Sequence, residues 1–189
     1  MWAAYAGDAD ADILPDLPTL RERCRDLYYN NPTARSGIET PVINVVGTGL
    51  KLQSRIDRAV LPLSDEQADA WEATTEREWR LFWGSKNCHA ARILKGNSLT
   101  RAVYRQARIN GDIFIQLTRA PGINPAWFPY SLRLQMIEAD RVCNKDYQRD
   151  TETLAGGIQK NAAGAPIAYH ILKHHPFGLD FKPHDWMEI

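Results

Sequence analysis

The order of two residue periodicities constrains the fold of this chain most strongly. Up to about residue 111, apolar residues recur every three or four positions, which is the period of an amphipathic helix. From Asp112 onward, apolar and polar residues alternate, as in strands with one buried face. A run of helices followed by a run of strands is typical of α+β folds rather than of a wound parallel sheet. We therefore predict an α+β fold in which N-terminal helices pack on a mainly antiparallel sheet.

The helical half divides into four predicted helices. The first covers about residues 19–30 and the second about residues 32–46. Pro41 lies inside the second helix and is expected to kink it, because its ring removes a backbone donor. A third helix begins at Ser64, and a fourth runs from about Ser98 to Gly111.

The third helix carries two local signals. Gln67 stands three positions after Ser64, which is the spacing of a capping box. Five residues at helical spacing are expected to form its buried stripe: Ala68, Trp71, Thr75, Trp79 and Phe82. Because Trp71, Trp79 and Trp83 lie at helical spacing and share the apolar stripe, packing in a core or between subunits is favoured over stacking on nucleic-acid bases.

The second half is predicted to hold strands at 112–117 and 131–138, followed by a C-terminal β-hairpin. Residues 157–161 and 166–172 form the hairpin, because they flank the small residues Ala-Ala-Gly-Ala. A further short strand is expected within the last ten residues, 180–189.

The chain has 189 residues, a length that fits one domain. Residues 1–18 are acidic and contain prolines, so we expect them to form an extended N-terminal arm. Residues 19–189 are then expected to form the α+β domain.

The Gly-Thr-Gly at positions 47–49 has two interpretations, a phosphate-binding loop or the end of a helix. A dinucleotide-binding loop needs a strand before the glycines and a helix after them. Here a predicted helix precedes them, and Leu50 to Ser54 alternates like a strand. We therefore expect Gly47 to end a helix and the segment after Gly49 to form a strand.

Composition excludes several classes of protein. Lys+Arg and Asp+Glu are equal at 23 each, which argues against a strongly basic nucleic-acid module. The apolar runs are too short to cross a bilayer, and the acidic N-terminus lacks the features of a signal peptide. Three scattered cysteines indicate neither a disulfide framework nor zinc spacing.

Two groups of residues have a chemical and a structural interpretation. His170, His174 and His175 cluster in sequence, but a metal site would also require them to converge on one point, and exposed histidines at a strand end are favoured. Cys88 and His89 could suggest a thiolate and its base, but adjacent side chains rarely face each other, and a buried thiol is favoured. We expect no catalytic residue, cofactor or metal.

Two groups of charged residues also have both a chemical and a structural interpretation. Glu138, Asp140 and Arg141 could perform acid–base chemistry, although carboxylates beside an arginine are more often a structural ion pair. Arg101, Arg105 and Arg108 are predicted to share one face of a helix and are candidates for contacts with DNA phosphates or a neighbouring subunit. A solvated charged face is the competing interpretation.

Five segments in order give the chain a resemblance to the lambda-type family of phage portal proteins. The segments are LRERCRDLYYNNPTARSGIETPVINVVGTGLKLQ at 20–53, REWRLFW at 77–83, ARINGDIFIQL at 107–117, LRLQMIEADRV at 132–142 and GIQKNAAGAPIAYHI at 157–171. None is specific alone. Together they cover nearly the whole chain from about residue 15 onward.

The resemblance implies a structural protein and no enzyme. Such proteins form a dodecameric ring at one vertex of the phage head, assembled in the cytoplasm of the bacterial host. Double-stranded DNA passes through the ring without sequence preference, driven by the terminase. Implied partners are other copies of the chain, the terminase, head-completion proteins, scaffold and capsid proteins, but no membrane.

This sequence is less than half the usual length in that family. The resemblance therefore implies that it corresponds to the N-terminal, peripheral wing portion, incomplete at its C-terminal end. We expect the chain alone to be a monomer or a heterogeneous oligomer rather than a closed dodecamer. A nucleic-acid-binding module using Arg101, Arg105 and Arg108, and a small hydrolase built on Cys88 or the histidines, are the competing functions.

Overall fold

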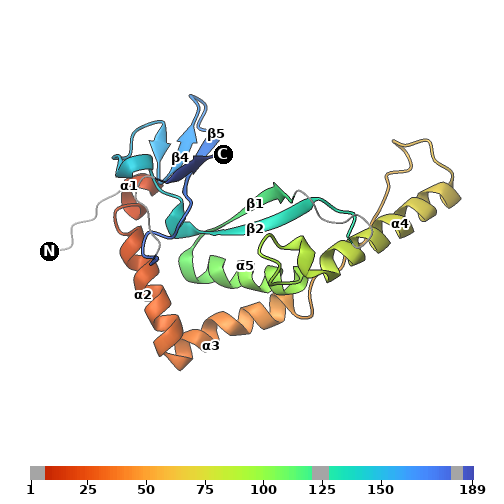
Figure 1. The fold of residues 1–189 in the computed structure, drawn as a ribbon, viewed down its shortest axis with the longest axis horizontal. Helices are drawn as coiled ribbons and strands as arrows, with labels where there is room; N and C mark the ends of the chain where they lie inside the picture. Colours follow the sequence, from red (N-terminus) through yellow and green to blue (C-terminus); the bar gives the residue numbers. More distant parts are fainter. Residues whose placement is uncertain (1–6, 121–127, 180–184) are drawn as a thin grey trace. The chain divides into compact units, whose positions relative to one another are not determined.

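The computed structural model describes residues 7–120, 128–179 and 185–189 (Figure 1). Its helices and antiparallel strands give an α+β fold, as predicted. The chain divides into two compact units. Unit 1 contains Met1–Arg35, Ala107–Phe114 and Ile137–Ile189, whereas unit 2 contains Ser36–Gln106 and Ile115–Met136.

Unit 1 begins with two helices, α1 (Ala9–Ile13) and α2 (Leu17–Asn30). The prediction of a helix at 19–30 is confirmed. The extended arm is wrong for residues 9–13 and 17–18. The Asp8 side chain accepts a hydrogen bond from the Ala11 backbone N–H at 2.7 Å and caps α1, and residues 17–18 already belong to α2. Residues 1–6 of the predicted arm lie outside the described residues.

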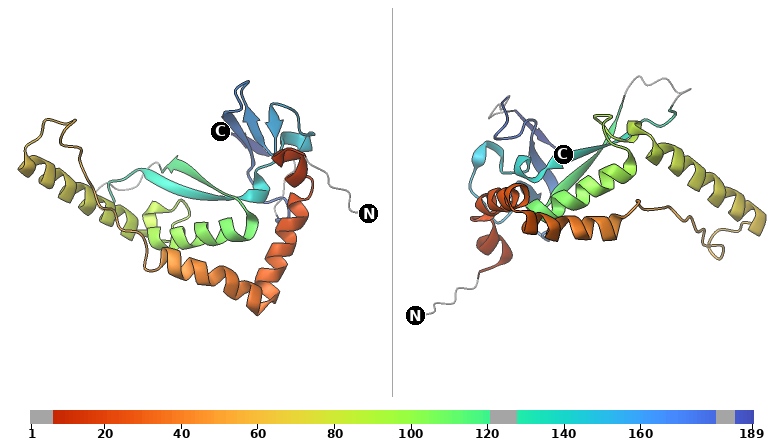
Figure 2. Two further views of the ribbon diagram at one scale, coloured as in Figure 1. Left: turned by 180° about the vertical axis from the view of Figure 1, so that it is seen from behind. Right: turned by 90° about the horizontal axis from the view of Figure 1, so that it is seen from below.

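A four-stranded antiparallel sheet completes unit 1. It runs in the order β3 (Leu154–Ala155), β4 (Ile158–Lys160), β5 (Pro166–Leu172) and β6 (Trp186–Glu188), which confirms the hairpin and the final short strand. The rest of the predicted final strand, residues 180–184, lies outside the described residues. Figure 2 shows α1 beside this sheet, where Asp10 forms an ion pair with Lys160 at 2.8 Å.

The core of unit 1 lies where this sheet meets the end of β2 and the residues that follow it. Ile137, Val142 and Ile171 are buried together, and Phe114, Tyr169 and Met187 pack around them. Two short 3-10 helices, Ala139–Arg141 and Lys145–Tyr147, connect β2 to the sheet. Cys143, between them, is half-buried, and burial raises the pKa of its thiol to about 11.

Pro41 changes the geometry of the second predicted helix. The α-helix α3 (Pro32–Pro41) ends there, and Val42–Val46 continue as a π-helix. A proline cannot donate the next backbone hydrogen bond, so the change of helix type begins directly after its ring. Gly47 then ends the helix with φ 52° and ψ −125°, a conformation that favours glycine.

The strand predicted after Gly49 is wrong. Residues 50–57 form no strand, because they have no strand neighbour to pair with. Their backbone instead donates to carboxylates of the next helix. Ser54 N–H donates to Glu76 Oε1 at 3.0 Å, and Ile56 N–H donates to Glu72 Oε1 at 2.8 Å.

That next helix is α4 (Asp65–Gly84), and its predicted capping box is present. The Ser64 hydroxyl accepts from Gln67 N–H at 3.3 Å, and the Gln67 side chain accepts from Ser64 N–H at 3.0 Å. The predicted stripe is buried at Ala68 and Phe82, but it is wrong at Trp71, which is 53% exposed. The rings on α4 that lie near Phe82 belong to Trp79 and Trp83, close to the C-terminal end of the helix. Among the described residues, the N-terminal half of α4, which carries Trp71, lacks such a cluster.

Three further elements contribute residues to both units. Helix α5 (Gly96–Asn110) ends at Gly111, which has φ 83° as expected for a helix stop. Strands β1 (Ile113–Arg119) and β2 (Leu132–Glu138) confirm two predicted strands and form a separate two-stranded sheet. Two sheets therefore take the place of the one expected. Over the residues described, no helix is both long and apolar enough to cross a membrane.

Candidate functional site

The predicted arginine row on α5 is engaged within the chain at two of its three positions. Arg101 Nε donates to the Gly47 carbonyl at 3.0 Å. Arg105 Nε and Nη2 donate to the two carboxylate oxygens of Glu39 at 2.6 and 3.0 Å, a bidentate geometry. Arg108 is exposed and belongs to the other unit. Arg101 and Arg105 therefore attach α3 and its terminal turn to α5.

The Gly-Thr-Gly corner is shaped by the same helix. Asn97 Nδ2 of α5 donates to the Thr48 carbonyl at 2.9 Å. Gly49 has φ 110°, and a Cβ there would lie 2.0 Å from Cγ of Asn97. A side chain at position 49 would therefore collide with the residue that binds the corner. The glycines form a packed turn, and no helix begins after them as a phosphate-binding loop requires.

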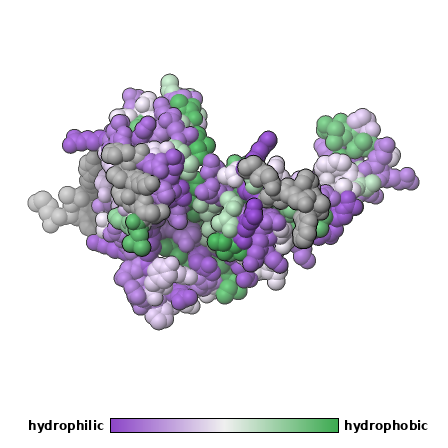
Figure 3. Space-filling model, in the orientation of Figure 1, coloured by the Kyte–Doolittle hydropathy of each residue, from purple (hydrophilic) through white to green (hydrophobic). Residues whose placement is uncertain are grey.

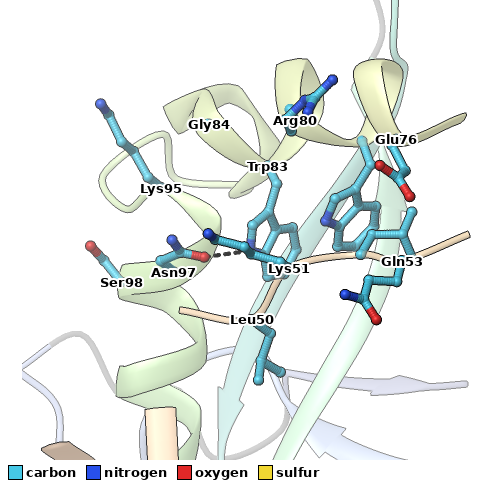
Figure 4. Close-up of a pocket in the computed structure, with 12 residues that line it drawn as sticks. Leu50, Lys51, Gln53, Glu76, Arg80, Trp83, Gly84, Lys95, Asn97 and Ser98 are labelled. Atoms are coloured by element: carbon cyan, nitrogen blue, oxygen red, sulfur yellow. Dashed lines mark hydrogen bonds between the residues drawn. The ribbon is translucent and has the colours of Figure 1, made fainter. Parts of the chain in front are cut away.

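Asn97 also orients an aromatic pair at the C-terminal end of α4. Its Oδ1 accepts from Trp83 Nε1 at 2.9 Å (Figure 4). The Trp83 ring stacks on Trp79 with 4.7 Å between centroids. A Cβ on Gly96 would lie 2.0 Å from the Trp83 ring, so this glycine allows α5 to start directly beneath the indole. The two tryptophans pack on a core of Phe82, Cys88 and Phe128, which confirms the packing interpretation for them.

A cavity of about 560 Å³ opens beside the tryptophan pair. Figure 4 shows Trp83 pointing from α4 toward Asn97, with Leu50, Lys51 and Gln53 supplied by the segment that follows the Gly-Thr-Gly corner. We call this space the tryptophan cavity. Its apolar lining is Leu50, Leu52, Trp79 and Trp83, and its cations are Lys51, Arg80 and Lys95. Sequence patterns did not indicate it, because residues on three separate segments surround it.

Cys88 and His89 are held in structural roles. Burial raises the pKa of the fully buried Cys88 thiol, so the thiolate is disfavoured. His89 Nδ1 lies 3.4 Å from the backbone N–H groups of Ile93 and Leu94, and burial lowers the pKa of its ring. The imidazole is thus directed at the backbone of the following turn, which supports the structural interpretation.

The expectation of exposed histidines is wrong, because His170 is buried and His174 and His175 are half-buried. Each of the three has its own partner in unit 1. His170 Nδ1 accepts from Lys145 N–H at 3.4 Å, whereas His175 Nε2 lies 3.3 Å from Asp140 Oδ2. His174 Nε2 lies 3.7 Å from Asp185 Oδ2. Within the ranges that the structure describes, no three His, Cys, Asp or Glu side chains converge as metal ligands.

The ion-pair interpretation of Glu138, Asp140 and Arg141 is confirmed. Arg141 Nη1 lies 3.5 Å from Glu138 Oε2, and its Nε donates to the Leu172 carbonyl at 2.7 Å. Asp140 forms an ion pair with Arg25 of α2. These contacts connect α2, the end of β2 and the end of β5 within unit 1.

Two arginines that the sequence patterns did not single out are more buried than the predicted row. Arg21 Nε of α2 donates to the Asn110 carbonyl at 3.1 Å, and its Nη2 donates to Asp112 at 3.0 Å. The side chain of Arg133 is 1% exposed, and its guanidinium lies 4.8 Å from the centre of the Phe128 ring. Arg133 occupies a polar position in the alternating pattern of β2, so nothing in the sequence indicated that it is buried.

Comparison with known proteins identifies the family. The family model described as "Phage portal protein, lambda family" matches residues 1–188. The chain is 25% identical over 178 residues to Portal protein B of Escherichia phage lambda, which covers 90% of this chain and 32% of that protein. It is also 25% identical over 177 residues to the Portal protein of Escherichia phage N15, with the same two coverages. The chain thus spans about a third of the length of these relatives and belongs to the lambda family of phage portal proteins.

Proposed function

We propose that this chain forms the N-terminal, peripheral part of a subunit of a phage head portal. The subunits assemble into a dodecameric ring at one vertex of the head, through which DNA enters during packaging and leaves during ejection. The observation that carries the proposal is the match of the family model to residues 1–188. The terminase, head-completion, scaffold and capsid proteins are the proposed partners, and the assembly forms in the host cytoplasm before it resides in the virion.

A structural role is supported by how the polar side chains are used. Arg21, Arg25 and Arg141 attach elements of unit 1 to one another, and Arg101 and Arg105 do the same in unit 2. Cationic side chains that already bind carbonyls and carboxylates serve to hold helices in place. A conduit for DNA needs this kind of rigid scaffold and no reacting group.

The same contacts argue against the competing nucleic-acid module. That function requires Arg101, Arg105 and Arg108 to face phosphates together. Arg105 instead makes a bidentate pair with Glu39, whose side chain is only 24% exposed. A phosphate would have to displace this carboxylate from the guanidinium. We therefore propose weak DNA binding without sequence preference.

Immunoelectron microscopy of particles from a phage that encodes this chain tests the portal proposal. An antibody against the exposed hairpin turn at residues 161–165 of unit 1 is expected to label a single vertex of heads opened at that vertex. Label spread over the whole shell, or absence of the chain from purified heads, would contradict the proposal.

A salt titration of DNA binding tests the competing module. For three phosphate contacts, the logarithm of the binding constant should fall with the logarithm of salt concentration with a slope of about −2.7. We expect a shallower slope, and we expect Arg105→Gln to lower stability more than it lowers DNA affinity. A steep slope that Arg105→Gln and Arg101→Gln each reduce by about one would favour the module.

A further inference from the structure

An exposed apolar loop precedes α4 in unit 2. Residues 59–63 read Ala-Val-Leu-Pro-Leu, and we call them the apolar tip. The side chains of Val60, Leu61 and Leu63 are 73%, 48% and 36% exposed. Figure 3 shows hydrophobic residues gathered over this loop. Exposed apolar side chains gathered in one place are typical of surfaces that another molecule covers.

Acidic residues surround the apolar tip. Residues 57–69 contain four acids, Asp57, Asp65, Glu66 and Asp69, and one basic residue, Arg58, for a net charge of −3. Arg58 is ion-paired with Asp65 and Asp69 at 2.5 Å each. A partner of the tip should therefore combine an apolar surface with excess positive charge.

The tryptophan cavity in the same unit has these properties. Its lining includes the four apolar side chains named above, and its three cations are offset by a single acid, Glu76, for a net charge of +2. Glu76 already accepts a hydrogen bond from Ser54 N–H, so it is not directed at an incoming group. The volume of about 560 Å³ lies within the usual range for sites that enclose a ligand.

The tip cannot reach the cavity of its own chain. The apolar tip lies at the N-terminal end of α4, whereas Trp79 and Trp83 lie near its C-terminal end. Fifteen residues of continuous helix separate Ser64 from Trp79, which is about 22 Å at 1.5 Å per residue. The helix keeps the two surfaces apart within one copy, so each surface can contact the other only on another copy.

We infer that the apolar tip of one copy docks into the tryptophan cavity of the next copy. This inference rests on the proposed portal function, which requires contacts between subunits, and it names one of them. The two surfaces differ, so the contact is head-to-tail and each docked pair leaves one free tip and one free cavity for further copies. Contacts of this kind close into a ring when the rest of the subunit sets the angle.

Two variants of the 189-residue chain separate the halves of this contact. The tip variant is Val60→Asp, and the cavity variant carries Arg80→Glu and Lys95→Glu. All three side chains are exposed, so the fold should persist, which circular dichroism verifies. Ile167→Asp, at a side chain that is 58% exposed in unit 1, is the matched control.

Sedimentation velocity over a concentration series gives the readout. The wild-type chain and the control are expected to form oligomers that grow with concentration. Each variant alone should associate about tenfold more weakly or worse, because one half of every contact is lost. An equimolar mixture should recover association but stop at a 1:1 dimer, since it contains one working tip and one working cavity. Native mass spectrometry with one variant isotopically labelled identifies that dimer.

Several outcomes would overturn the inference. These are a wild-type chain that stays monomeric, variants that associate as the wild type does, and a mixture that remains monomeric. A cavity variant that still forms dimers would indicate packing between tips and would also refute it. Labelling of a single vertex in purified heads tests the portal function separately, so failure of the docking contact alone leaves that function standing.

Discussion

Truncating Phe82 should show how much the aromatic core contributes to stability. The ring is 7% exposed, and four aromatic rings have centroids 5.6–6.3 Å from its own. They belong to Trp79, Trp83, Phe128 and Tyr130. Phe82→Ala removes these contacts and leaves a cavity, and such changes reduce the free energy of unfolding by about 3–5 kcal/mol.

The matched control is Trp71→Ala on the same helix. Trp71 is larger than Phe82 but is 53% exposed, so little packing is lost. Alanine also favours the helix more than tryptophan does, which offsets part of that loss. We therefore expect a change of less than about 1 kcal/mol in the free energy of unfolding.

Urea unfolding followed by tryptophan fluorescence and by circular dichroism measures both variants. With a slope near 2 kcal/mol per M, a loss of about 4 kcal/mol moves the midpoint by about 2 M. Coincident curves from the two probes justify a two-state treatment. If Phe82→Ala costs less than about 1 kcal/mol, or if Trp71→Ala costs as much as Phe82→Ala, the assignment of this core is wrong.

Three further predictions concern a helix cap, a titrating pair and two glycines. Ser64→Ala removes the acceptor that caps α4 and should lower the free energy of unfolding by about 0.5–2 kcal/mol in urea, so an unchanged midpoint would contradict the capping box. The hydrogen bond between the Tyr130 hydroxyl and the Glu78 carboxylate raises the pKa of Tyr130 to about 12 and lowers the pKa of Glu78. The folded pKa of Tyr130 exceeds its unfolded value of about 10, so its contribution to stability is complete below that pH and disappears as pH rises through 12. Tyr130→Phe should therefore abolish the late step in an ultraviolet absorbance titration and raise the pKa of Glu78, and a late step that persists would assign it to another tyrosine. Gly157→Ala should destabilise the chain, because φ is 81° and the new Cβ would lie 2.5 Å from the Cys143 nitrogen. Gly37→Ala should stabilise α3 by up to about 1 kcal/mol, because its new Cβ would meet nothing within 4 Å. Equal thermal midpoints for the two variants would refute this contrast.

Local signals in the sequence located the helix ends well. The capping box at Ser64, the interruption of the helix at Pro41 and the stop at Gly111 each depend on backbone groups within a few residues. The family assignment likewise depends on the order of segments along the chain. The interactions that begin and end these helices join residues close together in the sequence, so they could be predicted without the fold.

Tertiary structure decided which of the predicted surfaces are free. Residues 50–54 alternate like a strand, but a strand requires a neighbouring strand, and here the backbone of Ser54 pairs with a carboxylate of α4. Trp71 has helical spacing, but a helical face is buried only where another element covers it. Arg101 and Arg105 meet partners 54 and 66 residues earlier in the chain, at separations that no periodicity reports. Side-chain identities therefore determined the elements and the family, whereas long-range packing determined which charged and apolar groups remain available to another molecule.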